Sequence, residues 1–311
     1  MNIYVSGSLA FDRIMTFPGK FSDHILPDKI HILNVCFLVD GLDEKCGGTA
    51  GNIAYNLAML DEKPVVLAAV GKDFGPYRDR MLAMGLPVSG IRVIDGEFTA
   101  GAYITTDQSD NQITGFNPGA MKHRSRYTFP DVDPTAKSIA ILSPGNASDM
   151  MEYAEAYRQM GIPFIFDPGQ QIPVFTGQQL IDAIRGSFAL VTNDYELEMV
   201  LKATGLSRNG LLALTGALIT TLGEKGSVIA ENSSQHVIPP ATINRNLDPT
   251  GAGDAYRAGL LKGLALGKSL PAAGRLGSVC AAYCVEQRGT QEHSFTSEAF
   301  WQRVRENFGD L

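Results

Sequence analysis

The sequence predicts an α/β fold, with a mostly parallel central sheet, helices on both faces of it, and a small additional β-sheet. Short runs of apolar residues recur along the chain, and most segments between them have the apolar spacing typical of helices. Such alternation is typical of βαβ units, whose strands are buried on both faces. With 311 residues, of which 44% are hydrophobic and 19% charged, the chain can bury a large core.

The predicted strands of the central sheet are short apolar runs at 3–5, 65–70, 139–142, 163–166, 189–191 and 218–222. The clearest helical patterns lie between many of these runs, at 49–60, 77–84, 147–160, 178–184 and 195–203. The last third of the chain ends in further helical patterns at 253–266, 271–286 and 297–307. The order of these segments predicts parallel strands joined by crossover helices.

Two stretches, 30–40 and 99–116, break the alternation because they look like strands without crossover helices. In the second, the polar segment 107–111 separates two β-patterns, which is typical of a hairpin. We expect both stretches to form a small antiparallel sheet that acts as a lid, inserted from about 12–45 and 95–120. No repeat or flexible linker is present in the sequence, so 1–311 is expected to be a single domain.

Composition argues against several classes of protein. The net charge is −7, the pI is about 5.3, and no run of Lys and Arg stands out, so no nucleic-acid partner is expected. No apolar run reaches the roughly 20 residues needed to span a bilayer, and the first residues lack a signal-peptide pattern, so we expect a cytoplasmic protein without a membrane partner. The four cysteines are too few and too irregularly spaced for a disulfide framework. Cys280 and Cys284, four residues apart in a helical pattern, are expected to be buried apolar side chains rather than a metal-binding pair.

The most informative segment is the string Asp-Pro-Thr-Gly-Ala-Gly-Asp at 248–254, which opens an apolar helix. The small residues Gly251, Ala252 and Gly253 allow the backbone to approach a ligand closely, and the free N–H groups of a helix start carry partial positive charge. Together they predict an anion hole for a phosphoryl group. Asp254 either stabilises the helix dipole or serves as the base that accepts a proton from an acceptor hydroxyl.

This string closely resembles the C-terminal signature of the ribokinase-like (PfkB) family of small-molecule kinases. It is not a Walker P-loop, because no Gly-Lys-Ser/Thr follows the glycines. The resemblance implies a ribokinase-like fold, an anion hole at 251–253 and Asp254 as the catalytic base. It also implies ATP and Mg²⁺ as cofactors, with K⁺ as a further candidate whose site would include Asp248.

Further motifs extend the resemblance over nearly the whole chain. Asp12 follows the first strand, and the glycines Gly47 and Gly48 enter an Ala-rich helix that carries Asn52. The resemblance implies that Asp12, Gly48 and Asn52 bind the acceptor's hydroxyls, and a carboxylate that accepts two hydrogen bonds suits the vicinal diol of a ribose. By themselves these residues are equally typical of a turn or a cap.

Two more motifs concern the nucleotide. Asn193 and Glu196 resemble the family's Asn-x-x-Glu motif, which implies that they place Mg²⁺ and phosphate, with Glu196 acting on the metal through water. The same two residues also fit a capping box. Thr221, Gly223 and Gly226 match the family's Thr-x-Gly-x-x-Gly turn over the nucleotide phosphates, although a plain hairpin has the same pattern.

Features of the lid and of the last signature resemble prokaryotic nucleoside kinases of the family, notably the segments 110–114, 166–170 and 254–259. Many sugar-kinase relatives have Asn-Arg where this chain has Asn-Gln, so a cation is lost from the lid and Gln112 is the candidate acceptor-binding residue there. Arg257 either replaces that cation or is a surface charge. Apolar lid residues that can flank a purine are Phe37, Leu38, Tyr103 and Phe116.

The implied reaction is transfer of the γ-phosphoryl group of ATP to the 5′-hydroxyl of a nucleoside, with adenosine as the leading acceptor. Inosine, guanosine and cytidine stay open. One alternative is a sugar kinase that acts on ribose or a phosphorylated hexose, and another is a non-catalytic nucleoside or sugar sensor. The intact base and anion hole favour the enzyme, which we expect to be a monomer or a homodimer.

Overall fold

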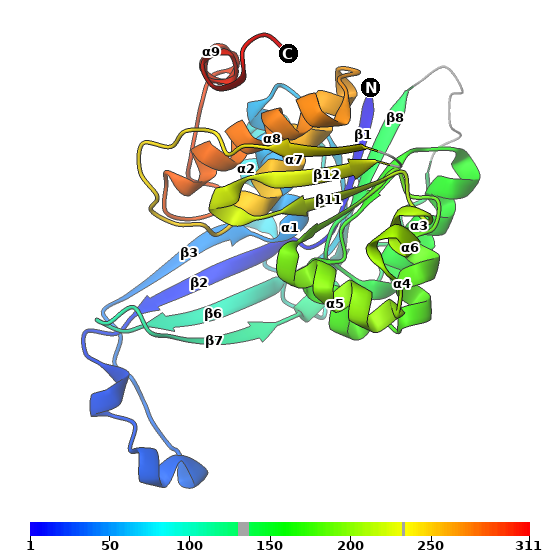
Figure 1. The fold of residues 1–311 in the computed structure, drawn as a ribbon. Coiled ribbons are helices and arrows are strands. Elements are labelled where there is room, and N and C mark those ends of the chain that lie inside the picture. Colours follow the sequence, from blue (N-terminus) through cyan, green and yellow to red (C-terminus); the bar gives the residue numbers. More distant parts are fainter. Residues whose placement is uncertain (130–136, 232–233) are drawn as a thin grey trace.

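The computed structural model describes residues 1–129, 137–231 and 234–311. Within them, one large sheet forms the body and a separate four-stranded sheet projects from it (Figure 1). The large sheet has the order β13 (Ser234–Ile238), β12 (Ser227–Glu231), β11 (Ala217–Thr221), β10 (Ala189–Asn193), β9 (Phe164–Phe166), β8 (Ser138–Leu142), β1 (Asn2–Ser6), β4 (Val65–Gly71) and β5 (Ile91–Ile94). Neighbouring strands from β5 to β11 are parallel, whereas β12 and β13 are antiparallel at one edge. The predicted parallel sheet is confirmed.

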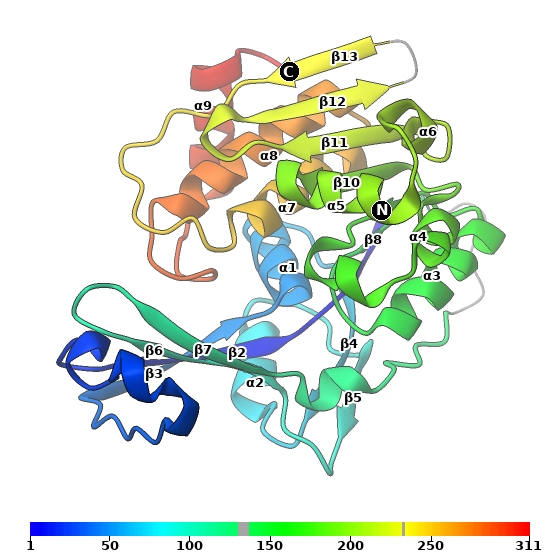
Figure 2. The ribbon, with the colours of Figure 1, turned by 60° about the horizontal axis from the view of Figure 1, so that its bottom comes forward.

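Helices cover both faces of this sheet (Figure 2). One face carries α1 (Thr49–Met59), α2 (Gly75–Ala83), α7 (Ala252–Ala265) and α8 (Leu270–Val285). The other face carries α3 (Ala147–Met160), α4 (Gly177–Ile184), α5 (Asp194–Thr204) and α6 (Arg208–Leu212). The last helix, α9 (Ser297–Phe308), packs against α8. Each helix predicted from the sequence is present, and α6 was not predicted.

Side chains alternate between the two faces as the pleat of a strand requires. In β1, Ile3 and Val5 belong to the core under α1 and α7, whereas Tyr4 belongs to the core under α3. Both sets are buried, which explains why this strand has a continuous apolar sequence. Helix starts are fixed locally: Asn146, Thr176 and Ser269 cap α3, α4 and α8 by accepting a hydrogen bond from a first-turn backbone N–H.

The second sheet has the order β3 (Gly41–Gly47), β2 (Ala10–Thr16), β6 (Ala100–Thr106) and β7 (Gln112–Asn117). The predicted hairpin is confirmed as the antiparallel pair β6–β7, but the expectation of a wholly antiparallel sheet is wrong, because β2 and β6 run parallel. Its turn is held by Asp107, whose Oδ1 accepts hydrogen bonds from the backbone N–H groups of Ser109 and Asn111 at 2.8 and 2.9 Å. Because β2 follows β1 and β3 precedes α1, this sheet is continuous with the core at the start of α1.

The predicted strand at 30–40 is wrong. Its first residues end a short 3₁₀ helix, Pro27–Ile32, and the strands that complete the second sheet are β2 and β3 on either side of this segment. Pro27 favours a helical turn at this point because its ring fixes φ and it has no N–H for a ladder. Several of the apolar side chains that suggested a strand are exposed, with Ile30 60% and Leu38 84% accessible, whereas Phe37 is half-buried. Apart from the bond that Asp40 N donates to the carbonyl of Thr16 at 2.9 Å, no strand among the described residues pairs with the segment.

Cys280 and Cys284 lie one turn apart in α8 and are fully buried, which confirms the expectation of small apolar packing. Burial raises the pKa of the Cys284 thiol to about 12, so the side chain stays protonated. Neither thiol is in a disulfide. Among the described residues, no helix has both the length and the apolar character needed to cross a bilayer.

Candidate active site

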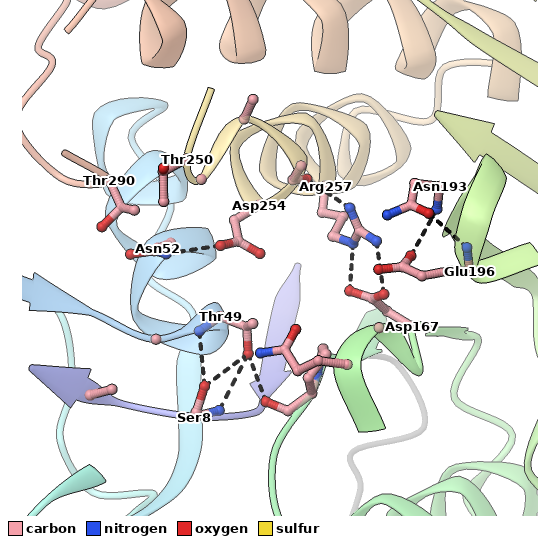
Figure 3. Close-up of a pocket in the computed structure, with 18 of the residues that line it drawn as sticks. Ser8, Thr49, Asn52, Asp167, Asn193, Glu196, Thr250, Asp254, Arg257 and Thr290 are labelled. Carbon is pink, nitrogen blue, oxygen red and sulfur yellow. Dashed lines mark hydrogen bonds and ion pairs between the residues drawn. The ribbon is translucent and has the colours of Figure 1, made fainter. Parts of the chain in front are cut away.

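The carboxyl-terminal ends of the parallel strands meet at one edge of the large sheet, where ligands bind in open α/β sheets. Asp167, Asn193 and Thr221 lie at or directly after the ends of β9, β10 and β11. They line a cleft of about 520 Å³, which is also lined by the starts of α1 and α7. Figure 3 shows Asp167, Asn193 and Asp254 among the residues that line this cleft.

The start of α1 is tied closely to the chain between β1 and β2. Gly48 has φ +86, and a Cβ on it would lie 2.6 Å from the carbonyl oxygen of Ser8. Only glycine fits both the backbone conformation and this contact. Ser8 Oγ accepts a hydrogen bond from Thr49 N at 3.0 Å, and Thr49 Oγ1 donates to the carbonyl of Pro144 at 2.8 Å (Figure 3). These bonds position the first turn of α1 in the wall of the cleft.

The glycine turn before α7 leaves backbone donors free. Gly251 has φ +80, and no side chain in the described part of the chain caps the helix there. The N–H groups of Gly251 and Gly253 have no acceptor among the described residues, whereas Ala252 N donates to the carbonyl of Pro249 at 3.2 Å. Asp248 holds the turn from outside, because its two carboxylate oxygens accept from Thr250 N at 2.9 Å and Gly289 N at 3.0 Å.

Asp254 projects into the cleft from the first turn of α7 (Figure 3). Its Oδ2 accepts a hydrogen bond from Asn52 Nδ2 at 2.8 Å, and Asn52 Oδ1 in turn accepts one from Gln291 Nε2 at 3.0 Å. Burial raises the pKa of Asp254 to about 6, against the opposing effects of Arg257 and Asn52. A base with that pKa is mostly ionised at neutral pH yet still binds a proton readily.

A buried ion pair lies beside Asp254. Arg257 Nε and Nη2 donate to the two carboxylate oxygens of Asp167 at 2.5 and 2.8 Å, and Nη1 donates to the carbonyl of Gly253 at 3.0 Å. Arg257 is 6% and Asp167 2% exposed, so the interpretation of Arg257 as a surface charge is wrong. Burial alone would lower the pKa of Arg257, but the Asp167 carboxylate outweighs this effect and raises it.

Asn193 and Glu196 form the capping box that their spacing predicted. Glu196 N donates to Asn193 Oδ1 at 2.7 Å, and Asn193 N donates to Glu196 Oε2 at 2.8 Å. Both residues also line the cleft, and Glu196 Oε1 has no hydrogen bond to any described residue. In the described part of the chain no three acidic, His or Cys side chains form a metal cluster. The donor set therefore fits Mg²⁺ that is held mainly by phosphates and water, with the Glu196 carboxylate accepting a hydrogen bond from one of those waters.

A second cleft, of about 460 Å³, adjoins the first. The two share the predicted nucleotide turn and the glycine turn, at Thr221, Gly223, Ala252 and Gly253. Gly226 lines only the second cleft. The 240–243 segment and α8 line much of the rest, including the apolar side chains of Ile243, Ala281 and Val285.

The structure brings most of the predicted acceptor residues together in the first cleft, namely Asp12, Gly48 and Asn52. The Asp12 carboxylate has no hydrogen-bond partner among the described residues, and burial raises its pKa. Gln112 is not brought to the cleft: it is exposed in the β6–β7 hairpin, with Nε2 3.5 Å from Thr106 Oγ1.

Of the apolar lid residues, Phe116 lines the first cleft, whereas Phe37 packs against Phe17 and Phe21. Sequence reasoning missed Gln291, which no motif includes, and the pairing of Asp167 with Arg257. A partial signal for the pair existed, because both residues lie in segments that resemble nucleoside kinases.

Comparison with known proteins shows which proteins this chain resembles in sequence and fold. The model of the "pfkB family carbohydrate kinase" family matches residues 23–297. A nucleoside kinase of Methanocaldococcus jannaschii is 32% identical over 263 residues, which cover 84% of each chain. The structure of a Burkholderia thailandensis nucleoside kinase in complex with inosine has 38% identity and a TM-score of 0.86, covering 99% of this chain and 98% of that one. The structure of that enzyme in complex with ADP-inosine has 40% identity and a TM-score of 0.84, covering 99% of this chain and 96% of that one.

The architecture is therefore the ribokinase-like α/β fold, with its large sheet and its small separate sheet. The chain belongs to the pfkB family of carbohydrate kinases.

Proposed function

We propose that the chain is an ATP-dependent kinase that phosphorylates the 5′-hydroxyl of a purine nucleoside, with adenosine as the first candidate. The observation that carries this proposal is the position of Asp254, which lies in the first cleft directly after the glycine turn that both clefts share. The nucleoside kinases named above, one of them solved with inosine, support a nucleoside acceptor over a free sugar.

ATP would occupy the second cleft, with its adenine between the 240–243 segment and α8. Its phosphates would then reach the wall shared with the first cleft, beside Thr221 and Gly223. The free N–H groups of Gly251 and Gly253 would donate to the oxygens of the transferring group. Mg²⁺ bound to the nucleotide supplies positive charge that offsets the charge of the phosphates, and Glu196 would hold one of its waters.

The nucleoside would occupy the first cleft. The Asp12 carboxylate, which has no hydrogen-bond partner among the described residues, suits the 2′,3′-diol of its ribose, and Gly48 allows the sugar to lie against the backbone. Phe116 and Met121 line the same cleft and offer apolar surface to the base. The sheet β3–β2–β6–β7 would act as a lid that excludes water during transfer.

In the reaction, the 5′ oxygen attacks the γ-phosphorus and the bond from that phosphorus to the bridging oxygen of ADP breaks. The hydroxyl proton passes to the Asp254 carboxylate and later to solvent, so the products are a nucleoside 5′-monophosphate and ADP. Asn52 holds Asp254 in place for this transfer. A monovalent cation at Asp248 stays a prediction, tested by comparing rates in K⁺ and in a large organic cation.

A substrate panel with ATP and Mg²⁺ tests the proposal. ADP formation is measured with adenosine, inosine, guanosine, cytidine, ribose and fructose 6-phosphate, and the product is identified by mass. We expect ADP formation that depends on a nucleoside, fastest with adenosine. Turnover of ribose or the hexose phosphate alone would make the chain a sugar kinase, and nucleoside binding without ADP formation would make it a sensor.

A further inference from the structure

The ion pair between Asp167 and Arg257 is the most deeply buried one in the described part of the chain. Removing two charges from water is expensive, and apolar residues of similar size are often at least as stabilising. A second pair on the same helix, Lys262 with Glu62, is closer to solvent, with side-chain exposures of 12% and 20% against 7% and 2%. Stability therefore does not explain why the pair of Asp167 and Arg257 is buried.

Its geometry connects it to the phosphate turn. Besides its two bonds to Asp167, Arg257 donates to the carbonyl of Gly253, whose own N–H has no acceptor among the described residues. A Cβ on Gly253 would lie 3.0 Å from Arg257 Nη1, so a glycine gives the guanidinium room to reach this carbonyl. The pair thus fixes the first turn of α7 to the end of β9, while Asp248 fixes the preceding residues on the other side.

The charges of the ion pair also act on Asp254. The charged groups that face Asp254 are Asp167 after β9, Glu196 on α5 and Arg257 on α7, while Asn52 on α1 is a neutral donor. The thiol of Cys284 on α8 is protonated. The two carboxylates raise the pKa of Asp254 and Arg257 lowers it, so Arg257 is the cation that keeps the base ionised among like charges.

We infer that Asp167 and Arg257 form a positioning pair for phosphoryl transfer: Asp167 orients Arg257, and Arg257 holds the phosphate turn and sets the charge at Asp254. This inference rests on the proposed function, because it takes Asp254 as the base. In this inference, Arg257 supplies the active-site cation that is missing from the lid, where this chain has Gln112.

Two single variants, for which we expect pH-profile shifts of opposite sign, distinguish this role from plain structural support. In Arg257→Gln the cation is lost, so the acidic limb of the kcat/KM profile should move up by about 1 pH unit. In Asp167→Asn a negative charge is lost while Arg257 remains, so the limb should move down. The double variant Asp167→Asn/Arg257→Gln avoids an unpaired buried charge and should fall between wild type and Arg257→Gln. KM for ATP and the melting temperature are measured in parallel.

The matched control is Lys262→Gln, which breaks the other ion pair of α7 and should leave the limb in place. Shifts of the same sign in both single variants, or no shift in a folded double variant, would overturn the inference. The proposed function fails by different outcomes: no acceptor-dependent ADP in the wild type, or an active Asp254→Asn. If the wild type phosphorylates nucleosides but the two single variants do not shift the acidic limb in opposite directions, only the inference of a positioning pair is rejected.

Discussion

At the scale of single residues, Asp254 owes its properties to neighbours that are distant in sequence. Asn52, on α1, donates to one carboxylate oxygen, and Gln291 orients that amide from the far end of the chain. Burial keeps water from stabilising the charge, and so raises the pKa of Asp254 to about 6. The same carboxylate at an exposed helix start would only interact with the helix dipole.

Asp254→Asn should fold and bind ATP but lose at least about 100-fold in kcat, because an amide cannot accept the hydroxyl proton. Steady-state kinetics with a saturating nucleoside measure the loss, and calorimetry measures ATP binding. The matched control is Glu298→Gln, which removes a first-turn carboxylate from α9, far from the cleft, and should keep the wild-type rate. Near-native turnover of Asp254→Asn would contradict its role as base.

The pH profile of kcat/KM follows from the raised pKa of Asp254. Below about 6 the carboxyl group is mostly protonated and cannot act as a base, so activity should fall about tenfold per pH unit toward acid and level off above that value. ATP affinity over the same pH range is the control, since binding does not require Asp254. An acidic limb near 4, the ordinary range of an Asp, would show that burial does not govern this group.

At the scale of elements, the start of α1 connects the two sheets. The chain passes from β3 through Gly48 into α1, and the backbone of Gly48 lies against the segment between β1 and β2. A side chain at this point would push α1 away from the strand edge and so displace Asn52 from Asp254. Gly205 ends α5 with φ +69, and no atom of the described residues lies within 4 Å of where a Cβ would stand. A side chain there would therefore cause backbone strain without a clash, which makes Gly205 a suitable comparison for Gly48.

Gly205→Ala should lower the free energy of unfolding by about 1 kcal/mol, from backbone strain. Gly48→Ala should lower it by at least about 1 kcal/mol more, because a steric clash adds to the strain. Chemical denaturation of both variants gives the difference. If both variants lose the same free energy of unfolding, the clash between the new Cβ and Ser8 is relieved without an energetic cost.

At the scale of the whole molecule, the second sheet extends from the body with much of its surface in water (Figure 1). Every residue of β7 is exposed, although Phe116 also lines the first cleft. Closure of this sheet over a bound nucleoside would bury the exposed face and remove water from the reacting groups. The unpaired segment before β3 keeps apolar side chains such as Leu38 in solvent.

Saturating adenosine should therefore slow hydrogen exchange in β6, β7 and the first turn of α1, because closure protects their backbone N–H groups. Exchange in α9, which packs on the outer side of α8, should not change and serves as the control. Mass spectrometry of peptides from both regions measures the difference. Unchanged exchange in β6 and β7 with nucleoside bound would contradict the lid.

Much of the fold could be predicted because its signals are local. The strands of the parallel sheet are continuous apolar runs, and the β6–β7 hairpin has a polar turn between two β-patterns. The segment 30–40 has a similar apolar composition, but composition does not show whether a partner strand is present. Pro27 and the absence of a neighbouring strand among the described residues decided that case.

By itself the sequence determined the alternation of strands and helices, the glycine turn at 251–253 and the carboxylate that follows it, since each depends on residues adjacent in the chain. Only the tertiary structure decided that Arg257 turns inward to Asp167, that Gln291 reaches Asn52, and that Gln112 stays outside the cleft. These contacts join segments up to 239 residues apart. Their formation depends on how the sheet and its helices pack, which no local pattern of residues encodes.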